Sequence, residues 1–359
     1  MTPPSPLPPP SFLAALRDGQ RAAMDNLRRA QANALDLFGF GVHESAFTVI
    51  ASGAHWRLRY YAGAATGPPL LMVPAPIKRP YVWDLTPAVS TVRFCLDQGF
   101  DVHLLEWAPP AGKDGAAGIE DHAQGAIATC AAIIADRAGA APFLLGHSLG
   151  GTLTAIACAL RPALARGLVL LGAPLAFAPG SSRFRDLVVS LKPADGPQDG
   201  VVAGSQLSQT CALLSPATFL WSRWMDGALS LADPAAMDIH IRIERWALDE
   251  VPLPGRLVHE IVGWLYREDR FHRGVLTIGR KTIGPADLRL PMLALVNAAD
   301  EIGPRASVEP FFRNMDGYTR IIEHPAEIGV GLQHLAILAG RWAHAETWPE
   351  IAAWMRAHA

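Results

Sequence analysis

The stretch FLLGHSLGGTLTAIA, residues 143–157, decides the fold, because it predicts a strand, a tight turn and a helix in immediate succession. The turn carries the pattern G-x-S-x-G, and this context is typical of a nucleophile elbow. Gly146 and Gly150 would let neighbouring backbone approach while Ser148 projects above a sheet. We therefore predict that Ser148 is a nucleophile and that the N–H of Leu149 faces a developing oxyanion. The alternative is a tight turn in which the serine is incidental.

Outward from this stretch, short apolar strands alternate with helical segments joined by short loops. Strands are predicted at AFTVI, HWRLRYY, PLLMV, DVHLLEW, PFLLG and GLVLL, and again at PMLALVN and TRIIEH. This alternation predicts an α/β core, residues 45–178 and 290–359, with a mostly parallel sheet and helices on both faces. Residues 179–289 are Trp-rich and largely helical, without a clear strand of the main sheet. We predict that they form a helical cap over the carboxyl ends of the strands.

The N-terminal part of the sequence has a different character. Residues 1–10 are rich in proline, which predicts an extended, disordered tail. Residues 11–44 carry apolar side chains at helical spacing, which predicts an amphipathic helical segment broken at Gly39. This segment is expected to pack on the body of the protein. The alternative is that it offers a docking surface to a subunit, a granule or a lipid surface.

Composition narrows the class of protein. Half of the 359 residues are hydrophobic, and 31 basic residues face 33 acidic ones, a balance that argues against a nucleic-acid partner. The sequence shows neither a signal peptide nor an apolar run long enough to cross a membrane. The scattered cysteines are expected to be reduced, which favours a cytoplasmic protein; they are Cys95, Cys130, Cys158 and Cys211.

A serine nucleophile of this type needs an acid and then a histidine later in the chain. Asp300 directly follows the predicted strand PMLALVN, so its loop should turn back toward Ser148. Asp316 and Glu323 are also acidic, but neither follows a buried strand so closely. We therefore predict that Asp300 is the acid; the alternative is a surface-loop carboxylate.

Two histidines compete for the role of base. The base must reach Ser148 with one ring nitrogen and Asp300 with the other. His334 follows a glycine-rich loop and precedes the final helices, which suits that geometry, and His324, at the end of a strand, is the alternative. His147, inside the elbow, is expected to be a packed side chain rather than a base.

The second oxyanion donor should come from the loop PAPIKRP after the strand PLLMV. Its prolines at 74 and 76 have no N–H, so Ala75 and Ile77 are the candidate donors. No cluster of histidines and carboxylates has metal-ligand spacing, and the predicted triad needs no metal. We expect neither a metal nor another cofactor.

Beyond these residues, three segments closely resemble the poly(3-hydroxyalkanoate) synthases. They are residues 69–110, with D-L-x-P after a Tyr; residues 244–291; and DEIGP at residues 300–304, in place of that family's D-x-I-x-P around its catalytic aspartate. The resemblance runs from about residue 45 to the C-terminus and implies the α/β-hydrolase fold. Two departures stand out. The synthases carry a cysteine in the elbow, and they tend to have glycine where this chain has Gln333.

The serine changes the expected chemistry. A thioester on cysteine passes its acyl group downhill to a hydroxyl, whereas an oxoester on serine is close in free energy to the polymer ester, so hydrolysis is the favourable exit. We predict an esterase or thioesterase acting on 3-hydroxyalkanoate esters or oligomers through an acyl-serine. The first alternative is a synthase-like acyltransferase using hydroxyacyl-CoA. The second is an inactive homologue that binds a granule or a partner. The resemblance also implies that the protein forms a homodimer or associates with polymer granules.

The aromatic residues of the cap allow two interpretations. They form the core of the cap, or they line an apolar substrate channel above the nucleophile, for which Trp221, Trp224 and Trp246 are the candidates. Basic residues that would suit a coenzyme A phosphate are also scattered here, and their role stays open: Lys78, Arg79, Arg242 and Arg245.

Overall fold

The computed structural model describes residues 10–64, 66–110, 115–190 and 200–359. Residues 1–9 of the predicted tail lie outside this range. The central sheet has eight strands in the order β1 (Thr48–Ser52), β2 (Trp56–Tyr61), β6 (Asp101–Trp107), β3 (Pro69–Val73), β7 (Phe143–His147), β8 (Gly167–Leu171), β13 (Met292–Asn297) and β14 (Thr319–His324). β1 with β2 and β2 with β6 are antiparallel, and the remaining pairs are parallel.

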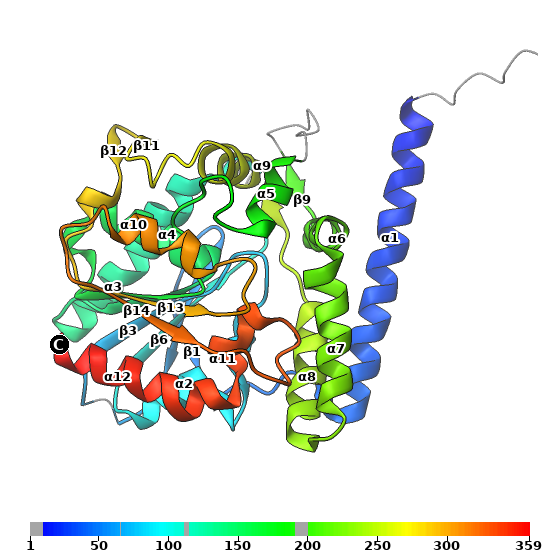
Figure 1. The fold of residues 1–359 in the computed structure, drawn as a ribbon, viewed down its shortest axis with the longest axis horizontal. Helices are drawn as coiled ribbons and strands as arrows, with labels where there is room; N and C mark the ends of the chain where they lie inside the picture. The colour runs from blue at the N-terminus through cyan, green and yellow to red at the C-terminus, as the bar shows by residue number, and fades with distance from the viewer. Residues whose placement is uncertain (1–9, 65, 111–114, 191–199) are drawn as a thin grey trace, which may run out of the picture.

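Helices cover both faces of this sheet (Figure 1). One face packs against η4 (Asp121–Ala128), α3 (Thr129–Ala138) and α4 (Leu149–Leu160). The other packs against α2 (Thr91–Asp97), α11 (Ala336–Ala339) and α12 (Trp348–Ala357). Every residue of β3, β7 and β8 is buried, as expected of strands covered on both sides. The predicted fold class, a mostly parallel sheet between helices, is confirmed.

The chain between β8 and β13 is mainly helical, as predicted. It contains α5 (Arg183–Ser190), α6 (Gly204–Leu214), η6 (Ala217–Trp221), α7 (Ser222–Ser230), α8 (Pro234–Ala247), α9 (Gly255–Glu260) and η7 (Ile261–Arg267). None of its described residues adds a strand to the central sheet. Two short ladders occur there, β9 (Val201–Val202) with β10 (Leu253–Pro254) and β11 (Leu276–Ile278) with β12 (Lys281–Ile283). Neither ladder joins the central sheet.

The N-terminal helix α1 (Pro10–Leu35) runs into η1 (Asp36–Phe40) and lies beside the helices of the insertion (Figure 1). Gly39 has a φ of 87°, so the helix breaks at the predicted residue. Its contacts with α8 include polar ones: Arg28 donates to the carbonyl of Ala247 at 2.9 Å, and Arg245 pairs with Asp36 of η1 at 2.7 Å. Part of this segment therefore packs on the body, as expected.

Shorter elements complete the described chain. They are η2 (Pro80–Trp83), β4 (Asp84–Thr86), β5 (Val89–Ser90), η5 (Pro162–Leu164), η8 (Pro285–Asp287), η9 (Arg305–Ser307), α10 (Glu309–Phe312), η10 (Gln333–Leu335) and η11 (Ala343–Thr347). Among the described helices, none combines the length and the apolar character that crossing a bilayer requires.

Candidate active site

Ser148 occupies the turn between β7 and α4 in a conformation that few non-glycine residues adopt. Its φ is 54° and its ψ is −134°, which is a strained region of the backbone map. Two backbone hydrogen bonds stabilise this strained conformation. The Ser148 N–H donates to the carbonyl oxygen of Leu171 at 2.9 Å, and the Ser148 carbonyl oxygen accepts from the Gly151 N–H at 2.9 Å. The side chain is thereby presented at the carboxyl end of the sheet.

The glycines of the elbow are required by packing. A Cβ at Gly150 would lie 2.5 Å from the carbonyl oxygens of Val73 and Pro74, and a Cβ at Gly146 would overlap Gly151. The close approach of Gly150 brings the loop after β3 against the elbow. This is the loop that carries the predicted second oxyanion donors.

His334 and Asp300 form a buried pair. His334 Nδ1 lies 2.7 Å from Asp300 Oδ2, and the two residues are 6% and 4% exposed. Burial raises the pKa of Asp300, but the charge and hydrogen bond of His334 outweigh it. The N–H groups of Ile302 and Gly303 act in the same direction, so the net pKa of Asp300 is lowered below its ordinary value. The acid is therefore charged while it holds the imidazole.

The other nitrogen of His334, Nε2, is buried and has no hydrogen-bond partner among the described residues. The ring packs on the end of β8, where a Cβ at Gly172 would lie 3.3 Å from its Cε1. Leu171 directly precedes Gly172, and its carbonyl oxygen accepts the hydrogen bond from the Ser148 N–H. The structure thus brings the three predicted triad residues to one end of the sheet, with an unoccupied nitrogen on the histidine.

His147 supports this arrangement from the elbow. Its Nε2 lies 3.1 Å from the carbonyl oxygen of His334, and the two ring centroids are 4.8 Å apart. Burial, with a smaller electrostatic contribution from neighbouring His334, lowers the pKa of His147 to about 3. A neutral ring that donates to a backbone carbonyl is a packed support for His334 rather than a base.

The alternatives for acid and base lie elsewhere. His324 is buried with both nitrogens occupied, Nε2 by Glu327 at 2.7 Å and Nδ1 by Thr347 at 2.9 Å. Asp316 and Glu323 are exposed. The geometry therefore favours His334 and Asp300.

The loop that carries Ala75 and Ile77 is held by neighbours on two sides. Trp107 Nε1 donates to the carbonyl of Pro74 at 2.8 Å, and the Val251 N–H donates to the carbonyl of Ile77 at 2.8 Å. Leu149 is the first residue of α4, where backbone N–H groups point out of the helix. Leu149 is thus part of the elbow, and Ala75 directly follows Pro74, whose carbonyl lies against Gly150. The role of Leu149, Ala75 and Ile77 in oxyanion binding stays a prediction.

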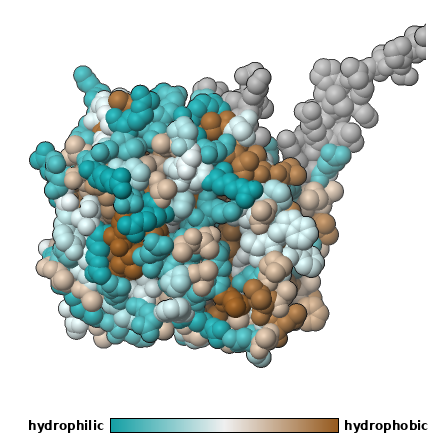
Figure 2. Space-filling view, viewed as in Figure 1, coloured by the Kyte–Doolittle hydropathy of each residue, from teal (hydrophilic) through white to brown (hydrophobic). Residues whose placement is uncertain are grey.

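The tryptophans proposed for substrate binding separate into two groups. Trp221 and Trp224 are 69% and 77% exposed. The hydropathy surface shows apolar patches over the helices of the insertion (Figure 2). Trp246 is half-buried, donates to the carbonyl of Arg79 at 2.8 Å and lies under Lys78. The structure therefore places Trp221 and Trp224 on the outer surface, neither in the core of the insertion nor in an enclosed channel.

All four basic residues considered for phosphate binding lie beside carboxylates, with Arg79 4.0 Å from Glu106. Lys78 contacts Glu250 at 3.1 Å, and Arg242 contacts Asp238 at 3.0 Å, while Arg245 binds Asp36. Burial lowers the pKa of Lys78 to about 8, although the ion pair opposes this shift. A bound phosphate would have to displace these carboxylates.

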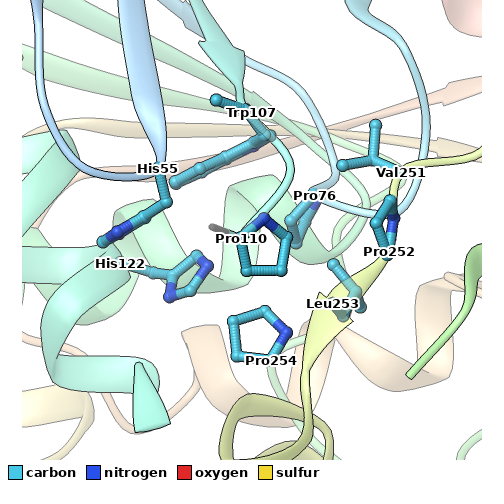
Figure 3. Close-up of a pocket in the computed structure, with 10 residues that line it drawn as sticks. His55, Pro76, Trp107, Pro110, His122, Val251, Pro252, Leu253 and Pro254 are labelled. Atoms are coloured by element: carbon cyan, nitrogen blue, oxygen red, sulfur yellow. The ribbon is translucent and has the colours of Figure 1, made fainter. Parts of the chain in front are cut away.

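A small cavity lies behind the loop after β3 (Figure 3). Its volume is about 10 Å³, which is room for roughly one water molecule and not for an acyl chain. It is lined mainly by His55, Pro76, Trp107, His122, Pro252 and Pro254. Within the described part of the chain, no group of three or more His, Cys, Asp or Glu residues is arranged to hold a metal ion.

Two residues around His334 were not predicted from the sequence. The Gln333 side chain donates to the carbonyl of Glu327 at 2.7 Å and accepts from its N–H at 3.0 Å. Asp226 accepts from the backbone of the loop before His334. The departure from glycine at position 333 was a signal that could have drawn attention to Gln333. Asp226 lies more than 100 residues from Gly329 and Gly331, so no local pattern could have linked it to this loop.

Known proteins resemble this chain in sequence and in fold. No family model matches the chain. The chain is 27% identical over 291 residues to the poly(3-hydroxyalkanoate) polymerase subunit PhaC of Haloferax mediterranei, covering 80% of this chain and 58% of that protein. It is 26% identical to the subunit of Allochromatium vinosum, covering 80% of each. The chain thus spans less than two thirds of the Haloferax relative.

Solved structures show the same fold. A monoacylglycerol lipase from Paleococcus ferrophilus matches with a TM-score of 0.51 and 19% identity, covering 85% of this chain and 99% of that protein. An α/β-hydrolase fold protein from Nakamurella multipartita matches with a TM-score of 0.51 and 15% identity, covering 88% and 100%. The chain therefore has the α/β-hydrolase fold, and its sequence is similar to the poly(3-hydroxyalkanoate) polymerase subunits.

Proposed function

We propose that this protein is a serine hydrolase of the esterase or thioesterase type, with Ser148 as nucleophile, His334 as base and Asp300 as the residue that orients the base. One observation carries the proposal. His334 is bound to Asp300 through Nδ1 while its Nε2 is buried without a partner among the described residues, at the end of the sheet where the strained Ser148 stands. That nitrogen is free to accept the serine proton.

The reaction follows from these positions. As Ser148 attacks an ester carbonyl, its proton passes to His334, and the charge on Asp300 stabilises the imidazolium that forms. N–H groups of Leu149 and of Ala75 or Ile77 bind the oxyanion. The leaving alcohol or thiol takes the proton from His334. Water then cleaves the acyl-serine by the same steps in reverse order.

The substrate class is proposed from the relatives, which are named as poly(3-hydroxyalkanoate) polymerase subunits. Esters or oligomers of 3-hydroxyalkanoates fit that resemblance, and the serine favours their hydrolysis. An acyl-serine is an ordinary ester, so its transfer to a second hydroxyl gains little free energy, whereas water is present in large excess.

The second candidate is a synthase-like acyltransferase that takes hydroxyacyl-CoA, and the sequence similarity to the polymerase subunits favours it. The exposed apolar face around Trp221 and Trp224 supports association with a polymer granule or a second copy of the chain. The same face would serve an inactive homologue that only binds such partners, which makes the state of Ser148 the decisive measurement.

A fluorophosphonate probe tests the serine directly. The wild-type protein is expected to be labelled, and Ser148→Ala to be unlabelled, while Asp316→Asn, at an exposed carboxylate, retains labelling. Absence of labelling in the wild-type protein would refute the hydrolase and favour the binding protein.

Product analysis then separates hydrolysis from transfer. With a 3-hydroxyalkanoate oligomer, the wild-type protein should release free 3-hydroxy acid. With hydroxyacyl-CoA it should release coenzyme A and free acid, whereas polymer with little free acid would establish the acyltransferase instead. Ser148→Cys is the matched variant, because its thioester intermediate should shift the products toward transfer.

A further inference from the structure

Helix α7 has its polar face turned inward. Asp226 and Ser230 are 6% and 0% exposed, whereas Trp224 and Met225 are 77% and 59% exposed. A surface helix normally buries its apolar face. Since a buried carboxylate is unfavourable unless it is paired and hydrogen-bonded, the partners of Asp226 explain why this helix is inverted.

Those partners lie in the loop that leads to His334. Asp226 Oδ1 accepts from the Gly329 N–H at 2.8 Å, and Oδ2 accepts from the Gly331 N–H at 2.8 Å. His240 of α8 completes the set, with Nδ1 2.7 Å from Oδ2. The carboxylate therefore binds two backbone groups of the body and one side chain of the insertion.

The loop is shaped for this contact. Gly329 and Gly331 have φ values of 96° and 64°, which favour glycine. A Cβ at Gly329 would also lie 2.9 Å from the carbonyl of Ala236 in α8. Two left-handed glycines separated by one residue thus turn their N–H groups toward the same carboxylate.

The contact lies three residues before the base. From Gly331 the chain passes Leu332 and Gln333 and reaches His334, and Gln333 ties the same loop to Glu327 on its other side. A shift of this loop would move the buried imidazole relative to Ser148. Displacements of about 1 Å at a reacting group lower rates by roughly 100-fold.

We propose that Asp226 is a positioning residue for His334: its carboxylate fixes the Gly329–Gly331 turn, and the turn fixes the imidazole that serves Ser148. The proposal rests on the proposed serine hydrolase mechanism. It adds that a residue of the helical insertion, about 100 positions before this turn in the sequence, helps to orient the histidine that accepts the serine proton.

The test is Asp226→Asn, which keeps the shape of the side chain but leaves one oxygen to receive two N–H groups. Asp238→Asn is the matched control, because Asp238 is a partly exposed carboxylate of neighbouring α8 that pairs with Arg242. We expect the labelling rate of Ser148 by a fluorophosphonate to fall about tenfold or more in Asp226→Asn and to stay within about twofold in the control. With an ester substrate, kcat should fall while KM changes little.

A spectroscopic readout separates this proposal from the proposed function. The Nδ1 proton shared by His334 and Asp300 should give a downfield proton resonance in the wild-type protein, which His334→Gln would assign. It should broaden or shift in Asp226→Asn and persist in Asp238→Asn. If the wild-type protein is not labelled, the hydrolase proposal fails, and this resonance still reports whether Asp226 orients the imidazole.

Folding is controlled separately. If Asp226→Asn does not fold, His240→Leu removes one donor to the carboxylate and leaves both N–H contacts, so a smaller slowing of labelling is expected. Unchanged labelling, kcat and resonance in a folded Asp226→Asn protein would overturn the proposal, as would unchanged values in His240→Leu if only that variant folds.

Discussion

Replacing Asp300 by asparagine should remove most of the catalytic rate without removing the side chain. The carboxylate lies 2.7 Å from His334 Nδ1 and is buried. When His334 takes the serine proton, a positive charge appears beside this negative one. At an effective dielectric constant of about 20, that attraction is worth about 6 kcal/mol at this distance, which corresponds to roughly a 10⁴-fold change in rate.

The same substitution disturbs the imidazole tautomer. An aspartate can only accept from Nδ1, which leaves Nε2 free to receive the serine proton, whereas the asparagine amide can donate to Nδ1 and favour the wrong tautomer. We therefore expect kcat for ester hydrolysis to fall by about 10³- to 10⁴-fold, close to the loss known for the equivalent change in serine proteases. KM should change little, because the carboxylate does not contact the substrate.

The assay compares kcat and the fluorophosphonate labelling rate of wild-type protein, Asp300→Asn and Asp316→Asn at neutral pH. Asp316 is exposed and should tolerate the change. A loss of less than about tenfold in a folded Asp300→Asn protein would refute the reasoning, because the charge would then play no part in the relay.

The lowered pKa of Asp300 also has a consequence for stability. A carboxyl whose folded pKa lies below its unfolded value of 3.8 adds stability above that value and loses it as the pH falls through the folded value. The free energy of unfolding of the wild-type protein should therefore decline below pH 3.8, and this part of the decline should be absent in Asp300→Asn. Urea titrations at a series of acidic pH values measure it.

Three further changes probe the surroundings of the relay. Gly172→Ala places a Cβ at a residue whose φ is 55° and within 3.3 Å of His334, so we expect the free energy of unfolding to fall by about 1–2 kcal/mol and kcat to fall as well. Gly139→Ala is the control, because Gly139 has a φ of 68° and nothing within 4 Å. This variant should lose stability but keep kcat. Gln333→Gly removes two hydrogen bonds to the loop backbone and should lower the urea unfolding free energy by about 2–3 kcal/mol. Because the pKa of His147 is lowered from 6.5 to about 3, unfolding takes up a proton in that window; wild-type stability should drop by about 2 kcal/mol between pH 7 and pH 5, and His147→Gln should drop less.

The amino-acid sequence was sufficient to predict those site residues whose position depends on neighbouring residues in the chain. The elbow combines a strand, two glycines and a helix within 15 residues, so the pattern alone was enough to place Ser148 in a tight turn. Asp300 could be placed because the carboxyl ends of parallel strands meet at one edge of a sheet, and its acidic side chain follows β13 directly. The choice between His334 and His324 depends on three-dimensional contacts, since both follow β14 or end it and only their hydrogen bonds distinguish them.

The orientation of the insertion could not be predicted in the same way. Aromatic side chains usually bury large areas, which led to the expectation that Trp221 and Trp224 face a core or a channel. The structure turns them outward because the opposite side of α7 carries Asp226, whose partners are glycine N–H groups elsewhere in the chain. Every residue except proline carries a backbone N–H, so the glycine-rich loop indicated a turn before His334 but not which carboxylate its N–H groups would bind.

Helix α7 contributes both to the proposed catalytic site and to the exposed apolar face proposed for association. Its inner face holds the turn before His334, and its outer face exposes Trp224 and Met225 to whatever the protein meets in solution. If α7 were only a surface for association, an apolar inner face would serve equally well, and no carboxylate would have to be taken out of water. A carboxylate that binds two N–H groups close to the proposed base explains why that desolvation is retained, because small displacements of a reacting group lower the rate steeply. The effect of Asp226→Asn on kcat, compared with its effect on the unfolding free energy, is therefore the measurement that separates these two explanations.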